Sequence, residues 1–410
     1  MFLLSETMRD EFLAVPQLVR LVLPDNAESG AALLIKGSSL TLKYLVRLRT
    51  FTFLVAPLGG DGHVLYGVKV DDDIDHVVIF WSLAETENEL LAMRLLTEHQ
   101  QCAVFLFNEG AINVCSTSTA FVDTKRQTTG VLGAVKLAIP EDLHHLRGAA
   151  TELLDSAHKT AYSNMLTYAP TSPCLWQPIR NYYITNQMDN SLLDLVNGNE
   201  GDQQETLAVW LTDTLSITGA VQKPQIHEAS GMRELTDVLF SYSGGSFLIE
   251  SKTLSVLDRS ELPSRAKLKK NVLKNISKAL SQMPGACRNV KRGLKITNVK
   301  GEEVQVERSL PIHCVVLVPD LSLLDESDGL GGDFLEDFLK DNGAYLHFLD
   351  PSALLRSVQH AGILAKHSEK GMPRIMAFDS ALMIRWREAI KHATPDIDLL
   401  FRVVAPQPSV

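Results

Sequence analysis

Two carboxylates and a lysine near the middle of the chain have the residue types and spacing suited to metal-assisted hydrolysis. Asp237 ends the run RELTD, and Glu250 and Lys252 lie in the run FLIESK. A Ser-Gly-Gly segment between the runs permits a two-residue hairpin loop at 243–244 or at 244–245. The first loop places Asp237 opposite Glu250, and the second places it opposite Lys252. Because side chains alternate along a strand, either loop puts all three on one face.

This grouping predicts a divalent-cation site. Burying two carboxylates and an ammonium group beside the apolar residues Phe247, Leu248 and Ile249 is costly unless a partner compensates their charge. Asp237 and Glu250 supply the hard oxygen ligands that Mg²⁺ (or Mn²⁺) prefers. A bound metal activates water, and Lys252 would orient that water or stabilise the developing charge. The chemistry indicated is phosphodiester hydrolysis. The alternative is a half-exposed strand whose Glu and Lys merely alternate outward.

A strongly basic segment follows the predicted hairpin. The chain has a formal net charge of -10, yet residues 252–300 contain thirteen Lys or Arg and two acids. A helix is expected from Ser264 to Met283, ended by Pro284-Gly285. Five of its polar residues recur at steps of three or four and should share one face. These predicted nucleic-acid-binding residues are Lys267, Lys270, Lys274, Lys278 and Gln282. The alternative is a solvated helix face, or one that docks an acidic protein partner.

Apolar periodicity predicts the elements that must position these residues. A helix is expected over 205–216, before the two hairpin strands at 235–242 and 246–256. Beyond the basic helix, strands are expected at 312–318 and 344–349, and a helix at 353–360. The resulting order is helix, hairpin, helix, strand, helix, strand, helix.

Over residues 205–360 this pattern resembles the PD-(D/E)xK, or restriction-endonuclease-like, nucleases. Asp237, Glu250 and Lys252 fit the core motif, and Glu205 fits the acid of the first helix and is thereby implied as a fourth catalytic residue. Lys274, Lys278 and Gln282 are placed like the phosphate-contacting helix of the family. No proline precedes Asp237, which departs from the motif. The resemblance implies a mixed sheet flanked by helices, and a role in restriction, phage defence or repair.

Composition predicts a globular α/β protein in three parts. We expect an N-terminal α/β module of unknown role over 1–125, a mainly helical connector and linker over 126–204, and the nuclease-like domain with a C-terminal helical extension over 205–410. The five cysteines form no CxxC pair, and no apolar stretch approaches the length of a membrane helix. There is no P-loop and no G-x-S-x-G motif. A cytoplasmic protein without a membrane partner is expected.

The resulting functional prediction is a Mg²⁺-dependent nuclease acting on nucleic acid, with DNA favoured over RNA. Its N-terminal module would serve in sensing, positioning or dimerisation, and would contact a second copy of the chain or a partner protein. The alternative is a catalytically inactive nuclease-fold protein that binds nucleic acid or serves in assembly.

Overall fold

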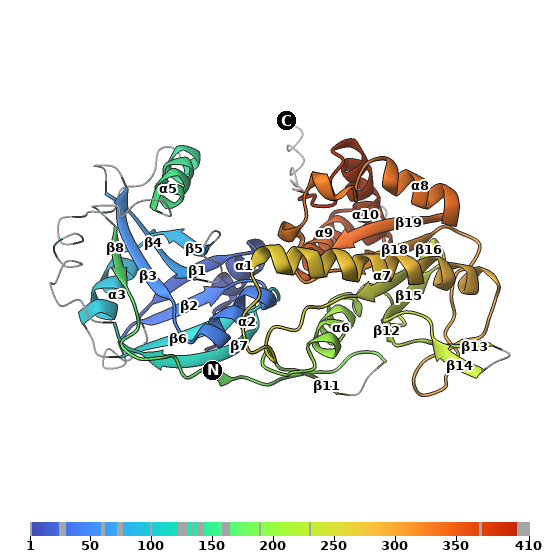
Figure 1. Ribbon diagram of the computed structural model, residues 1–410, viewed down its shortest axis with the longest axis horizontal. Coiled ribbons are helices and arrows are strands. Elements are labelled where there is room, and N and C mark those ends of the chain that lie inside the picture. Colours follow the sequence, from blue (N-terminus) through green and yellow to red (C-terminus); the bar gives the residue numbers. More distant parts are fainter. Residues whose placement is uncertain are drawn as a thin grey trace. The chain divides into compact units, whose positions relative to one another are not determined.

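The chain forms two compact units. The computed structural model describes residues 2–23, 30–58, 62–71, 77–98, 101–121, 130, 132, 135, 137, 143–157, 165–187, 190–228, 231–368 and 371–399. The first unit comprises Met1–Asn181, Asp194–Gly198 and Val256–Arg265, and the second comprises Tyr182–Leu193, Asn199–Ser255 and Ala266–Val410. Figure 1 follows the chain through both. None of the helices in these ranges combines the length and the apolar character of a membrane-spanning segment.

The described residues of the first unit form two sheets. One has the strand order β1-β2-β6-β7-β9, in which β2 and β6 are parallel and the other pairs antiparallel. The other has the order β5-β4-β3-β8 and is antiparallel throughout. The strands are β1 (Leu18–Val22), β2 (Ala32–Lys36), β3 (Thr52–Leu58), β4 (His63–Val70), β5 (Val78–Leu83), β6 (Cys102–Phe107), β7 (Asn113–Thr119), β8 (Leu166–Tyr168) and β9 (Gln177–Pro178).

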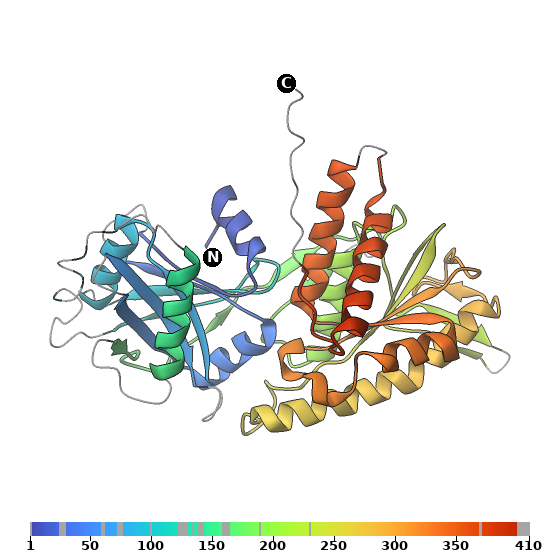
Figure 2. The same cartoon turned by 90° about the horizontal axis from the view of Figure 1, so that it is seen from above.

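The helices described beside these sheets are α1 (Glu6–Ala14), α2 (Ser39–Leu48), α3 (Glu87–Glu98) and α5 (Leu143–Ala157). Local chemistry fixes the start of α2, because the Ser38 hydroxyl accepts a hydrogen bond from Thr41 N. The buried Glu109 carboxylate accepts two more bonds there, from Ser39 N and Ser39 Oγ. Helix α5 packs Ala150 and Leu154 against the second sheet. Figure 2 shows this helix, in green, beside the blue strands.

The second unit is built on a mixed five-stranded sheet of order β12-β15-β16-β18-β19. Strands β16, β18 and β19 are parallel, whereas β15 pairs antiparallel with both β16 and β12. In a smaller sheet, of order β14-β13-β17, the strands β13 and β14 lie in the chain between β12 and β15, and β17 comes later in the chain. The strands are β12 (Val221–Gln222), β13 (Gln225–Glu228), β14 (Gly231–Glu234), β15 (Val238–Tyr242), β16 (Gly245–Ser251), β17 (Ile296–Thr297), β18 (Ile312–Leu317) and β19 (Ala344–Leu349), with a separate pair β10 (Asn181–Tyr183) and β11 (Ser191–Leu193).

Strands β16 and β18 form the core of this sheet, and every one of their residues is buried. Helices cover both sheet faces. Phe247 of β16 lies 5.6 Å from Phe378 of α10, between ring centroids, whereas Cys314 of β18 contacts Cys287 of α7 on the opposite face, Sγ to Sγ 3.2 Å. The helices of this unit are α6 (Glu200–Thr212), α7 (Arg265–Lys291), α8 (Asp333–Asn342), α9 (Pro351–His367) and α10 (Arg374–Lys391), with short 3₁₀ turns η2 (Leu321–Leu323) and η3 (Glu326–Asp328).

The predicted α/β class is confirmed, but several element boundaries differ from the sequence prediction. Helix α6 begins at Glu200 rather than Glu205, because the Asn199 side chain caps Asp202 N. Strand β16 ends at Ser251 rather than Val256. Helix α7 continues through Pro284 to Lys291, although an internal proline removes a hydrogen bond and costs about 3 kcal/mol. Packing offsets that cost, since Met283, Ala286, Cys287 and Val290 extend the buried side of the helix.

Candidate active site

The hairpin β15–β16 brings the predicted catalytic residues together. Tyr242 pairs with Gly245 and Val238 pairs with Ile249, so the loop is Ser243-Gly244. Asp237 immediately precedes β15 and therefore lies opposite Glu250, as the first of the two possible loops requires. Neither loop residue has a positive φ. The hairpin therefore does not use the type I′ or II′ turn that is typical of two-residue loops. Gly244 serves a different purpose, because a Cβ there would lie 2.5 Å from the Tyr242 ring.

Asp237, Glu250 and Lys252 form a compact, largely buried cluster. Lys252 Nζ donates to Glu250 Oε2 at 2.8 Å and lies 3.9 Å from Asp237 Oδ2. Asp237 Oδ2 also accepts a hydrogen bond from Ser251 N at 2.5 Å. The side chains of the three residues are 12%, 6% and 14% exposed, in that order. The hairpin therefore holds two acids and one base at the carboxyl end of the central strand.

Helix α6 delivers Glu205 to the same neighbourhood. The preceding residue anchors this helix, because Gln204 Nε2 donates to Ser251 Oγ at 3.0 Å and to Leu317 O at 3.1 Å, at the ends of β16 and β18. Burial and the nearby charge of Asp237 raise the pKa of Glu205. Its Oε2 atom is buried and accepts no hydrogen bond of regular geometry from the described residues, although Lys223 Nζ lies 3.2 Å away. The site thus includes the acid that the resemblance implied.

Lys223 is a member of the site that the sequence prediction missed. Its ammonium group lies 2.8 Å from Asp202 Oδ1 and 3.2 Å from Glu205 Oε2, and its backbone N–H donates to Asp237 O at 2.7 Å. Its φ of 48° is unusual for a residue with a side chain. Such strained backbone gathers at functional sites. No local sequence signal could reveal it, because Lys223 lies just after a two-residue strand and its acidic partners are on α6.

Glu234, at the end of β14, adds a further carboxyl group. Partial burial of that group, followed by the charges of Asp237 and Glu205, raises the pKa of Glu234 to about 7. The residue as a whole is exposed, although its carboxyl group is partly buried beside these acids. Burial and Asp237 likewise raise the pKa of Glu250, against the opposing effect of Lys252. Negative charge in the cluster is therefore only partly compensated by the two lysines.

This cluster has the oxygen donors for a hard cation but is not a ready-made cage. Among the described residues, no group of three or more His, Cys, Asp or Glu is arranged to hold a metal ion. Mg²⁺ commonly binds through one or two carboxylates, with waters and substrate phosphates completing its shell. Asp237 and Glu250 fit that sparse mode. The raised pKa values of Glu205 and Glu250 further indicate carboxylates that a cation would stabilise.

The predicted basic face is present on α7. Lys267, Lys270, Lys274, Lys278 and Gln282 are all exposed, on the side opposite Leu268, Val272, Ile276, Ala279 and Met283. Lys270, Lys274 and Lys278 make no ion pair with any described residue. Midway along this helix, Asn275 Nδ2 donates to Thr253 O at 2.9 Å and so links α7 to the residue after Lys252.

Comparisons with known proteins do not extend this description. No family model, curated protein or solved structure matches the chain. The geometry and the chemistry of the site are therefore what indicate its function.

Proposed function

We propose that the protein is a metal-dependent nuclease that hydrolyses phosphodiester bonds in nucleic acid, with DNA as the favoured substrate. The observation that carries this proposal is the hairpin register, which sets Asp237 opposite Glu250 with Lys252 within hydrogen-bonding distance of the latter. The mixed sheet, with an acid-bearing helix before the hairpin and a basic helix after it, supports a restriction-endonuclease-like fold for residues 205–360. A cytoplasmic role in restriction, phage defence or repair is part of the proposal.

In this proposal Asp237 and Glu250 hold Mg²⁺ (or Mn²⁺). When bound, the metal lowers the pKa of a coordinated water and neutralises charge on the phosphate. Lys252 keeps a fixed ammonium group beside both carboxylates, from which it can donate to a phosphate oxygen as negative charge develops. Glu234, with a pKa of about 7, can take up or release a proton near neutral pH. Lys223 offsets the charge of Glu205 and holds that side chain toward the cluster.

Nucleic acid would be held by the exposed side of α7. Arrays of lysines bind the phosphate backbone largely without regard to sequence. The three lysines without ion-pair partners in the described chain are available for this, whereas Lys269 on the same helix is already paired with Asp325 and Asp328.

A second candidate is a catalytically inactive protein that retains this site for binding or assembly. One observation favours it: each metal-ligand candidate already has an internal partner, Lys252 Nζ for Glu250 and Ser251 N for Asp237. Both interactions give the carboxylates a partner without a metal ion. Activity measurements separate the two candidates.

The test is cleavage of mixed DNA and RNA substrates by the purified full chain with Mg²⁺, Mn²⁺ or EDTA. We expect metal-dependent cleavage that falls by orders of magnitude in Asp237→Ala and Glu250→Ala. Lys252→Ala should lose about 10²–10³-fold, as expected for deleting one donor to a developing charge. The control Glu336→Gln changes an exposed acid on α8 and should keep full activity. Full activity in Asp237→Ala or Glu250→Ala would refute this site, and salt-sensitive binding without cleavage would favour the inactive alternative.

A further inference from the structure

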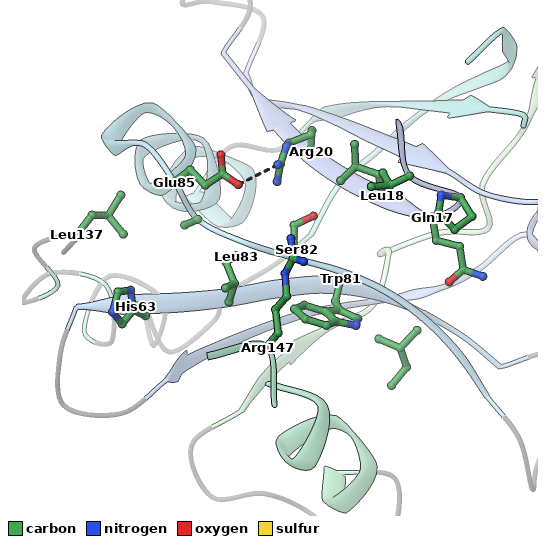
Figure 3. A pocket seen from close by; sticks show the side chains of 14 residues that line it. Gln17, Leu18, Arg20, His63, Trp81, Ser82, Leu83, Glu85, Leu137 and Arg147 are labelled. Carbon is green, nitrogen blue, oxygen red and sulfur yellow. Dashed lines mark hydrogen bonds and ion pairs between the residues drawn. The ribbon is translucent and has the colours of Figure 1, made fainter. Parts of the chain in front are cut away.

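The first unit contains a cleft of about 750 Å³ that is separate from the candidate active site. Its walls come from the segment leading into β1, from β5 and from α5. Figure 3 shows the side chains that line it. The volume lies within the range of sites that bind small molecules, which combine mainly apolar walls with a few polar groups.

The cleft exists because β1 and β5 are the outer strands of two different sheets. A hydrogen bond links these strands, in which Ser82 Oγ of β5 donates to Val19 O of β1 at 2.7 Å. Beside this contact, Arg20 donates through Nε to Glu11 Oε1 at 2.8 Å and pairs with Glu85 at 3.2 Å. The hydroxyl of Ser82 and the charge of Arg20 are thus already used in holding the walls together.

Three other lining groups remain available to a ligand. Arg147, His63 and the indole N–H of Trp81 make no side-chain hydrogen bond or ion pair with any described residue, and each side chain is at least partly accessible. Figure 3 shows Arg147 reaching from α5 toward β5, where Trp81 and Leu83 lie. The guanidinium and indole groups donate hydrogen bonds and accept none, and a neutral imidazole supplies one donor.

Apolar surface lies next to these donors. The flat indole of Trp81 is flanked by Leu83 and Ile79, and Leu18 lines the opposite wall. A planar ring system would bury its surface against such walls. An anionic group on the same molecule would satisfy the arginine, since charge-assisted hydrogen bonds are about twice as strong as neutral ones.

We propose that this cleft binds a small molecule that combines a planar apolar ring system with one anionic group. Trp81 packs against the rings, and Arg147 takes the anionic group. The proposal gives the amino-terminal unit a ligand-binding role that does not depend on the nuclease proposal.

The test uses two fluorescent probes that differ by one charge, 8-anilinonaphthalene-1-sulfonate and the neutral N-phenyl-1-naphthylamine. Each is titrated against the full chain and against Arg147→Gln, Trp81→Leu and Trp81→Phe. The control is Arg9→Gln, which removes an exposed arginine on α1 that does not line the cleft. Circular dichroism and melting temperature establish that each variant is folded, and Trp81→Phe keeps an aromatic ring should Trp81→Leu not fold.

We expect the natural chain to bind one equivalent of the sulfonate probe. Arg147→Gln should weaken its binding about tenfold while changing the affinity for the neutral probe less than about twofold, since only the charge-assisted bond is lost. Trp81→Leu should weaken the binding of both probes, and Trp81→Phe should weaken it less. Arg9→Gln should leave the binding of both probes unchanged. Absence of saturable binding, or equal affinity for the sulfonate probe in the natural chain and Arg147→Gln, would overturn the proposal.

Discussion

Replacing Glu234 by glutamine should prevent part of the loss of stability that the folded chain undergoes as the pH rises. The pKa of Glu234 is raised from 4.5 to about 7 in the folded chain. A carboxyl group with a raised pKa binds its proton more tightly in the folded state than in the unfolded state. Its contribution to stability is therefore present below about pH 4.5 and is lost as the pH rises toward about 7. Glu234→Gln removes this loss.

The magnitude follows from how far the pKa rises and from the exposure of the side chain. A rise of one in the pKa corresponds to about 1.4 kcal/mol, so the full value would be about 3 kcal/mol. Glu234 is exposed, and solvent screening reduces this to about 1 kcal/mol. For a folding unit as large as the second one, 1 kcal/mol moves the melting temperature by about 2–4 °C. Glu234→Gln should therefore match the natural chain near pH 5 and melt about 2–4 °C higher near pH 8.

The assay is thermal unfolding from pH 5 to pH 8 in EDTA, repeated with Ca²⁺. A bound cation should shrink the difference between Glu234→Gln and the natural chain, because it compensates the same negative charge. The control is Glu228→Gln on the neighbouring β13, where hydrogen bonding to Arg233 lowers the pKa. The stabilising effect of Glu228 is lost only as the pH falls below about 4.5. From pH 5 to pH 8 the melting temperature of this variant should therefore stay parallel to that of the natural chain. If the melting temperature of Glu234→Gln followed that of the natural chain in parallel from pH 5 to pH 8, the reasoning would be refuted.

Two further predictions concern the basic helix and the core. Changing Lys270 and Lys274 together to Gln should weaken binding of duplex DNA and reduce the slope of log affinity against log salt concentration by about two. The control Lys340→Gln on α8 should leave that slope unchanged. An unaltered slope in the double variant would assign this face to solvent. Phe247→Ala should destabilise the second unit by about 3–5 kcal/mol in denaturant unfolding. The ring of Phe247 is fully buried and stacks on the rings of Phe240 and His313, with centroids 4.7 and 4.8 Å apart. A loss of unfolding free energy below about 1 kcal/mol would contradict that packing.

Local patterns in the sequence were sufficient for the α/β class and for several elements of the second unit. The apolar runs that include Phe247–Ile249 and Ile312–Leu317 are strands, and the spacing of Lys267 to Gln282 on one exposed side of α7 follows directly from the helical period. The shared face of Asp237 and Glu250 was also predictable, because both two-residue loops have the same side-chain parity. These features depend only on neighbours within a few residues or across one short turn.

Only the tertiary structure decided the loop register and the full membership of the acidic cluster. The ring of Tyr242 requires glycine at position 244, and this packing is invisible in the loop sequence alone. Lys223 meets Glu205 through contacts between a helix and a distant loop. The same applies to the cleft between β1 and β5, and to the passage of α7 through Pro284. For Lys223, the cleft and α7, side chains far apart in sequence supply the deciding free energy, and local propensity does not contain that contribution.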